Sequence, residues 1–433
     1  MERSRASLKK IIVYFFLFYL LYLPKITELL FNIQSQIVIF IVFIILAFVR
    51  IDNIFSERID MCFSKQVMVK WIISIFYLSS YATIIALLND KPNRFFQYFY
   101  TVIWLLTLYW YKKTIIDDYL SNEQLIELLF IFGAIQGLIC IAMLIFPALK
   151  EIANQLYYLG GERNVFRTEK RIYGISNDYT FFTPCYHGFL ASFCLLYSVV
   201  KKKIFMIAVP LIFIATFMNN RTGIIIFLIN TVIIGVMILL DINVEDKVKI
   251  NLLKGGVLLF AALGISLMVI KLYNPKTYEY TIQGVLTAKE WASEQNYQLY
   301  FPSGLDLIFG NGDIQAGVTR IKYGWSIERN SDYGYVNDLF IGGLIYCAFL
   351  YLANFKFLFF KNNSIVFGIK MYQFDLISLI TLLISNYKGQ SMKSGFLIIA
   401  VFFIKLTLLD SIDSDKANVN CKERKVGGEI FED

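Results

Sequence analysis

The chain has 433 residues, of which 57% are hydrophobic, 17% aromatic and 17% charged, and its mean hydropathy is +0.59. This composition excludes a soluble globular protein and is typical of a polytopic membrane protein. The formal net charge of +8 follows from lysines and arginines that gather in the turns on one side of the apolar runs. The charge therefore predicts membrane sidedness, and we do not expect nucleic-acid binding.

Apolar runs recur along nearly the whole chain, and each can cross about 30 Å of hydrocarbon as a helix. The first run is long and lacks a small-residue cleavage site, so we interpret it as a retained span and not a signal peptide. The sequence predicts an all-α polytopic membrane protein with about twelve transmembrane helices. They are expected near residues 11–31, 36–49, 67–88, 95–111, 125–147, 179–200, 204–218, 222–240, 255–272, 335–357, 366–386 and 395–409.

Lysine and arginine placement predicts that both termini face the cytoplasm. Residues 1–409 form a single integral-membrane domain in this interpretation, and the polar tail 410–433 is expected to be cytoplasmic and disordered. Two longer segments, about 148–178 and 271–334, then fall on the outer side. Loops of this length usually have a function, and the second contains tryptophans and many tyrosines, which suit stacking on sugars.

Arg221 interrupts two apolar runs, within the stretch Asn219–Gly223. An arginine between two spans costs free energy unless it reaches water or holds an anion, so we interpret Arg221 as functional. The alternative is that Arg221 anchors a helix end at lipid phosphates. Gly223 leaves space for close packing beside it.

Two further groups of residues are predicted at the outer side. The first joins Arg171 and Gly174, where the first outer loop enters a span. Planar guanidinium groups can grip phosphate oxygens with two hydrogen bonds, which favours an anion site. The second group lies in and after the large loop and contains Gly310, Gly312, Arg320, Arg329, Asp332 and Tyr335.

Other common kinds of site are not indicated. The single histidine, His187, lies in an apolar span, and we interpret it as buried and hydrogen-bonded rather than catalytic. None of the six cysteines forms a Cys-x-x-Cys pair, so structural disulfides and zinc are not expected. No Walker-type phosphate loop is present, which argues against an ATP-driven pump.

The order and spacing of these motifs resemble the O-antigen polymerase and O-antigen ligase superfamily of membrane enzymes. Arg171-x-x-Gly174 is similar to its arginine–glycine element before a span. Arg221–Gly223 is similar to its serine-arginine-threonine-glycine turn, with Asn220 in place of the serine. Gly310–Gly312 is similar to the glycine-x-glycine of its large loop.

The resemblance implies a bacterial inner-membrane enzyme that transfers lipid-linked saccharides at the periplasmic face. Ligases of the superfamily carry a histidine-asparagine-x-tyrosine-leucine element where this chain reads Asp332–Val336, and the large loop has no histidine. This departure favours a polymerase. An O-antigen ligase is one alternative, and a lipid-linked oligosaccharide flippase or secondary transporter is another. Transporters usually place charges inside their spans, whereas the apolar runs here are expected to be poor in charge.

The resemblance also implies roles for individual residues. The donor and the acceptor are oligosaccharides linked to undecaprenyl diphosphate, and Asp332 is the candidate catalytic base, with a helix N-cap as its rival role. We expect no cofactor and no metal. Membrane lipids and a chain-length regulator are the remaining candidate partners. The expected diphosphate or substrate contacts are Arg171, Arg221, Arg320, Arg329 and Tyr335, with Arg221 also catalytic, and the expected supporting glycines are Gly174, Gly223, Gly310 and Gly312.

Overall fold

The chain is mostly helical, as expected when backbone polar groups in lipid must be satisfied within a segment. The structure is a computed structural model, and its description of the chain has gaps. It describes residues 2–24, 26–56, 62–91, 95–157, 172, 174–175, 182–219, 221–241, 244–276, 278–279, 282, 297–299, 301–313, 317–322, 325–330, 333–389, 391–393 and 395–428.

The helices follow the apolar runs in chain order. The first part of the chain contains α1 (Glu2–Tyr22), α2 (Ile26–Phe31), α3 (Ser35–Ser56), α4 (Phe63–Leu88), α5 (Phe95–Thr114), the 3-10 turn η1 (Ile116–Asp118), α6 (Asn122–Ile145) and α7 (Pro147–Tyr157). The second part contains α9 (Phe182–Val200), the 3-10 turn η2 (Lys203–Ile207), α10 (Ala208–Phe217), α11 (Arg221–Leu240), α12 (Asp246–Tyr273), α15 (Leu305–Phe309), α16 (Gly334–Leu358), α17 (Met371–Asn386) and α18 (Phe396–Gly428).

Five of the described helices, α4, α6, α9, α11 and α16, are long and apolar enough to cross a membrane. Shorter apolar helices fall at Ser35–Val49, Lys203–Phe217, Gly264–Tyr273 and Met371–Asn386. The all-α, multi-pass character predicted from the sequence agrees with this pattern. The predicted number of spans and the two outer loops stay predictions.

Two helices form the interior of the bundle. Side chains are buried along α9 from Thr183 to Val199, and along α18 from Phe396 to Ser411. Phe402 of α18 stacks on Phe357 of α16 with 3.8 Å between ring centroids. Most other helices bury only the face that they turn toward these two, which leaves apolar residues on the outside of the bundle for lipid.

The last helix extends past residue 410, where the predicted polar tail begins. Helix α18 ends at Gly428, and disorder of the tail stays a prediction. Asp410 is buried, and Lys112 and Lys113 of α5 approach its Oδ2 at 2.8 and 3.0 Å. The hydroxyl of Ser64 also donates to its Oδ1. These contacts secure α18 at the point where its sequence turns polar.

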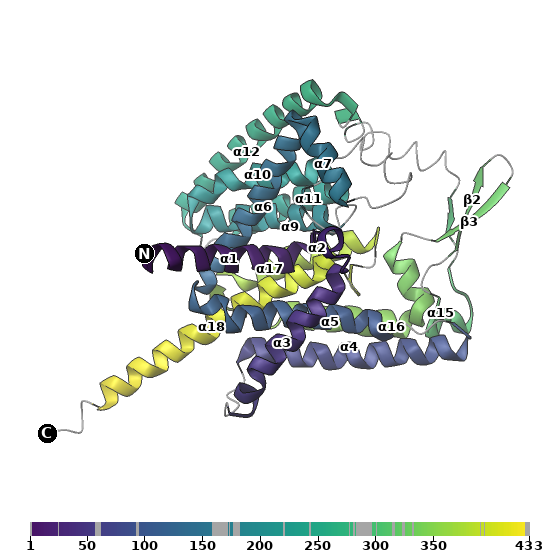
Figure 1. The fold of residues 1–433 in the computed structure, drawn as a ribbon, viewed down its shortest axis with the longest axis horizontal. Helices are drawn as coiled ribbons and strands as arrows, with labels where there is room; N and C mark the ends of the chain where they lie inside the picture. Colours follow the sequence, from purple (N-terminus) through teal and green to yellow (C-terminus); the bar gives the residue numbers. More distant parts are fainter. Residues whose placement is uncertain are drawn as a thin grey trace.

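The bundle has two distinct ends. Both chain termini lie at one end, and α15 with strands β2 and β3 lies at the other (Figure 1). At the end with the termini, lysines pair with carboxylates. A hydrogen bond to Glu127 raises the pKa of the exposed Lys202, and the partly buried Lys370 pairs with Asp241. The opposite end, called here the loop end, collects the C-terminal end of α4 and the N-terminal ends of α9, α11 and α16.

A small antiparallel sheet stands at the loop end. It contains β1 (Tyr297–Leu299), β2 (Gly317–Lys322) and β3 (Trp325–Asn330), in the order β1-β2-β3. Val318 of β2 faces Leu299 of β1 and Arg329 of β3. A second pair, β4 (Ile365–Val366) with β5 (Ile369–Lys370), forms a hairpin directly before α17.

Candidate functional site

Arg221 is the first residue of α11, which begins two residues after the buried Asn219. The Asn219 amide nitrogen donates to the carbonyl of Ala215 at 2.6 Å. Its Oδ1 has no hydrogen-bond partner among the described residues. Arg221 is partly exposed, so this turn places a guanidinium group at the loop end, where a helix N-terminus adds partial positive charge.

Gly223 lets α11 approach α9 closely. A Cβ at Gly223 would lie 2.5 Å from the carbonyl oxygen of Pro184 and 2.6 Å from a methyl carbon of Thr216. A Cβ at Gly188 of α9 would in turn lie 2.3 Å from the carbonyl oxygen of Gly223. The hydroxyl of Thr216 donates to the carbonyl of Pro184 at 3.1 Å. The base of the Arg221 turn is therefore packed backbone to backbone.

The segment before α9 is fixed to α6. A Cβ at Gly174 would lie 2.1 Å from the Oε1 of Gln136, so a side chain here would displace the Gln136 amide. The backbone N–H of Ile175 donates to the same Oε1 at 2.7 Å, and the Gln136 amide nitrogen donates back to the Ile175 carbonyl. Arg171, three residues before Gly174, lies outside the described residues.

A void of only about 10 Å³ lies between these segments, which is room for about one water molecule. It is too small for a sugar. His187 borders it, and its Nε2 lies 3.1 Å from the hydroxyl of Tyr22. The histidine is buried and in contact with aromatic rings, as its sequence position predicted. The void is lined by Gln136, Gly174, Thr183, Pro184, His187, Ala215 and Asn219.

The large loop docks on α4 and α16 through its glycines. Gly310 and Gly312 have φ values of +78° and +76°, which other residues rarely adopt. A Cβ at Gly310 would lie 2.4 Å from the Cα of Gly342 in α16, and one at Gly312 would lie 2.6 Å from the Cα of Ala86 in α4. Both glycines thus allow a close contact that a side chain would prevent.

Helix α16 is broken at Gly343, whose φ of 68° and ψ of −165° are not helical. The rings of Tyr335 and Tyr351 lie 5.9 Å apart, although sixteen residues of unbroken helix would separate them by about 24 Å. The short outer half, 334–342, therefore folds back toward the longer inner half, 344–358. The hydroxyl of Tyr335, an expected substrate contact, donates to the carbonyl of Leu383 at 2.7 Å and is engaged within the protein.

Three predicted site residues remain: Arg320, Arg329 and Asp332. Arg320 lies in β2 and Arg329 in β3, and the strand register puts the two positions diagonally opposite on one face of the ladder. Asp332, the candidate base, lies outside the described residues. Among the predicted residues that the structure describes, Gly174 contacts Gln136 of α6, Gly310 contacts Gly342 of α16, and Tyr335 contacts Leu383 of α17.

Sequence reasoning missed the buried charges. Asp338 of α16 is fully buried, as are Asp375 and Lys405. The Lys405 Nζ lies 2.7 Å from a carboxylate oxygen of Asp375. The apolar runs are poor in charge, but the few ionisable residues that they contain are buried, and single ionisable residues at wide spacing barely lower the hydropathy of a run. A better signal is an acidic residue inside an apolar helix, which by default marks a functional site.

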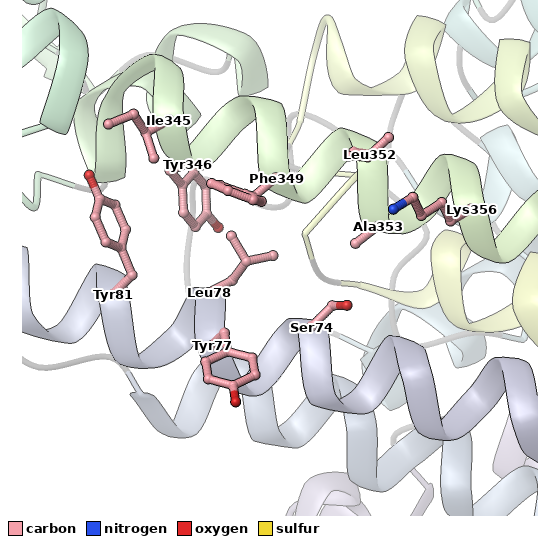
Figure 2. Close-up of a pocket in the computed structure, with 10 residues that line it drawn as sticks. All are labelled: Ser74, Tyr77, Leu78, Tyr81, Ile345, Tyr346, Phe349, Leu352, Ala353 and Lys356. Carbon is pink, nitrogen blue, oxygen red and sulfur yellow. The ribbon is translucent and has the colours of Figure 1, made fainter.

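An apolar groove runs between α4 and α16 (Figure 2). Its volume is about 490 Å³. Tyr81 stands at one end, and its hydroxyl donates to the carbonyls of Phe309 and Gly342 at 3.0 and 3.2 Å. Lys356 stands at the other end (Figure 2). Tyr77 and Phe349 of the lining are 70% and 62% exposed, so the groove opens on the outside of the bundle directly below the docked loop.

No family model, curated protein or solved structure matches the chain. Among the described residues, no group of three or more His, Cys, Asp or Glu side chains is arranged to hold a metal ion. The chemistry of the loop end must therefore be argued from its own residues.

Proposed function

We propose that the protein is a surface-polysaccharide polymerase of the O-antigen polymerase type, acting at the periplasmic face of the bacterial inner membrane. The observation that carries the proposal is that tertiary contacts fix all three motif segments. Gly174 and Asn219, just before Arg221, border one small void, and Gly310 and Gly312 pack on α16 and α4. Both termini lie at the end of the bundle opposite the loop end (Figure 1), which fits a cytoplasmic location for them.

The proposed reaction joins two lipid-linked saccharides. A hydroxyl at the non-reducing end of a new repeat unit attacks the anomeric carbon of the growing chain. The bond from that carbon to the diphosphate oxygen breaks, undecaprenyl diphosphate leaves with the electron pair, and the hydroxyl proton passes to a carboxylate, for which Asp332 is the candidate. Arg221 and Arg171 stabilise the charge that develops on the departing diphosphate. Arg320 and Arg329 bind diphosphate or sugar.

The groove between α4 and α16 suits this chemistry. It is lined mainly by aromatic and aliphatic side chains, opens on the outside of the bundle, and ends at the docked loop. An isoprenoid chain lying in it would place the attached diphosphate close to the loop end. The partners in this proposal are the two lipid-linked saccharides, membrane lipids and a chain-length regulator.

A transporter or flippase is the second candidate, and the structure offers one observation in its favour. Transporters often build their sites from discontinuous helices with buried ionisable groups, and α16 is broken at Gly343 with Asp338 buried nearby. The phenotype of a deletion strain separates these functions. Single repeat units attached to lipid A indicate a polymerase, loss of all attachment indicates a ligase, and repeat units retained inside the cell indicate a flippase.

Complementation of that strain tests the role of Arg221. Arg221→Ala should abolish long chains, and Arg221→Lys should restore them poorly, because a lysine cannot make the paired hydrogen bonds of a guanidinium group. We expect a loss of more than about a hundredfold in polymer formed, as for removal of one charge-stabilising donor. The measurement is the length distribution of the surface polysaccharide on gels.

The matched control is Lys247→Ala, which removes an exposed cation at the start of α12, at the other end of the bundle. It should leave chain length unchanged. Normal chains from Arg221→Ala, at normal protein level, would contradict a role in binding the diphosphate.

A further inference from the structure

A second hollow lies between α4 and α16, at the end of the bundle that holds the chain termini. Its volume is about 540 Å³. It shares Ser74, Ala353 and Lys356 with the apolar groove described above, and Lys356 stands at the end of that groove (Figure 2). The hollow and the groove therefore adjoin one another along the same two helices.

The floor of this hollow is apolar and tightly packed. Trp71 of α4 and Phe357 of α16 line it, are 3% and 1% exposed, and have their rings 5.8 Å apart. The Trp71 indole donates to the side-chain oxygen of Asn354 at 3.0 Å, which fixes the orientation of the ring. Phe355, which also lines the hollow, is 43% exposed. A hydrocarbon chain can therefore lie against this floor.

Three lysines line the same hollow, called here the lysine hollow: Lys70 of α4, Lys356 in the last turn of α16, and Lys361 just after α16. All three are exposed. The Lys70 Nζ lies 5.8 Å from the centre of the Phe360 ring, and the Lys361 Nζ lies 4.5 Å from the centre of the Phe63 ring. The two rings contact each other edge to face. Aromatic faces thus position two of the cations and leave their other sides open to an anion.

These lysines differ from others at the same end of the bundle. Lys202 pairs with Glu127, and Lys370 pairs with Asp241. The lining of the lysine hollow contains no carboxylate among the residues that the structure describes, and its three lysines form no ion pair with a described carboxylate. The protein's own described acidic groups therefore leave this positive charge uncompensated.

Cations beside an apolar floor match the chemistry of a phospholipid with an anionic headgroup. Basic hollows between transmembrane helices suit phosphate-containing headgroups, and the aliphatic stems of lysines let the ammonium groups reach the headgroup layer. A soluble phosphate compound would contact the lysines alone and leave the apolar floor uncovered. A phospholipid satisfies both surfaces, because burial of its acyl chain against the floor is also favourable.

We propose that the lysine hollow is a binding site for an anionic phospholipid of the leaflet on the side of the chain termini. Its phosphate contacts Lys70, Lys356 and Lys361, and an acyl chain lies on the apolar floor toward the groove. The lipid thereby bridges the start of α4 and the end of α16. The site lies at the end of the bundle opposite the proposed reaction and does not depend on the polymerase function.

The test is native mass spectrometry of the full-length protein in a neutral detergent, after incubation with phosphatidylglycerol or with phosphatidylcholine of the same acyl chains. We expect one phosphatidylglycerol to be retained with an affinity more than about tenfold above that of phosphatidylcholine. The triple variant Lys70→Gln, Lys356→Gln and Lys361→Gln should lower the affinity for phosphatidylglycerol by about a hundredfold, since one lysine near an anionic lipid surface contributes about a fivefold factor. Each single substitution should lower it by about fivefold.

The matched control removes three other lysines at the same end of the bundle, all outside the hollow: Lys203→Gln, Lys247→Gln and Lys249→Gln. This variant has the same net charge as the test variant and should keep the affinity for phosphatidylglycerol to within about threefold. Undiminished affinity in the test variant, or an equal loss in the control, would overturn the proposal.

Two further ligands test the identity of the occupant. Glycerol 3-phosphate has the phosphate without an acyl chain and should bind more than about tenfold more weakly than phosphatidylglycerol, because it covers no apolar surface. Equal affinities would indicate a site for a soluble phosphate compound and would overturn the lipid assignment. Undecaprenyl phosphate bound more tightly than phosphatidylglycerol, and lost in the test variant, would assign the hollow to an isoprenoid lipid and overturn the proposal in the same way.

Discussion

At the scale of single residues, two glycines of the same helix differ in whether the neighbouring helix leaves room for a side chain. Gly223 and Gly235 both belong to α11. A Cβ at Gly223 would overlap the backbone of α9, whereas a Cβ at Gly235 meets nothing within 4 Å. Close helix contacts in membranes depend on small residues in this way. The Arg221 turn is held in place by its neighbour two positions later.

We predict that Gly223→Val destabilises the folded protein by about 1–3 kcal/mol, the usual cost of overpacking a well-packed contact. Gly235→Val introduces the same side chain into the same helix and should change stability little. The measurement is the thermal unfolding midpoint of the purified protein in detergent. Equal effects of the two substitutions would show that α9 and α11 do not meet at Gly223.

At the scale of elements, the break in α16 determines the arrangement of the loop end. The sequence showed a Gly342–Gly343 pair inside an apolar run, but hydropathy does not reveal whether such a pair bends a helix. The decision is made by contacts distant in sequence: Ile308 and Phe309 occupy the space that a Cβ at Gly343 would need. The apolar pattern of the sequence predicts the helix α16, whereas its bend depends on tertiary packing that the pattern does not show.

Gly343→Ala should therefore lower the thermal unfolding midpoint of the protein more than Gly304→Ala does. Both glycines have positive φ, so both substitutions carry backbone strain of about 1–3 kcal/mol. A methyl group at Gly304 meets open space, while one at Gly343 would lie 2.3 Å from the carbonyl of Ile308. The difference between the two unfolding midpoints isolates the packing contact, and identical midpoints would refute the fold-back of α16.

Much of the helical framework could be predicted from the sequence, because apolar runs in a membrane have few structural options. The small sheet could not, since β1 pairs with β2 only through residues nineteen or more positions away. The candidate site was predicted in part. Arg221 and the glycines carry local signals, whereas Asp338 meets Tyr351 and Asn386 only through the fold of α16 and the end of α17.

At the scale of the whole molecule, the proposed function requires that the loop end faces the periplasmic side of the membrane. The loop end must face away from the cytoplasm if it is to meet saccharides assembled for export. Cys62, at the start of α4, is exposed and lies at the end of the bundle that holds both termini. Ser303, just before α15, is exposed at the loop end.

A membrane-impermeant maleimide should label Ser303→Cys in intact spheroplasts of a strain whose variant lacks Cys62 and Cys421. Native Cys62 should react only after the membrane is permeabilised. Labelling is followed by a mass shift on gels. The reverse pattern would place the arginines on the cytoplasmic side and remove the basis of the proposed reaction.

The burial of α18 has a consequence for how the protein is made. This helix runs through the interior and carries Lys405 and Asp410. Lys405 pairs with Asp375 of α17, and Asp410 pairs with Lys112 of α5. These charges are therefore paired once α18 is in place. The ribosome synthesises α18 after all the helices that surround it. The earlier helices are therefore inserted in the bilayer before the helix that fills the interior of the bundle. Insertion of α18 is the step that completes the bundle. A chain in which α18 fails to insert would be a substrate for quality-control proteases.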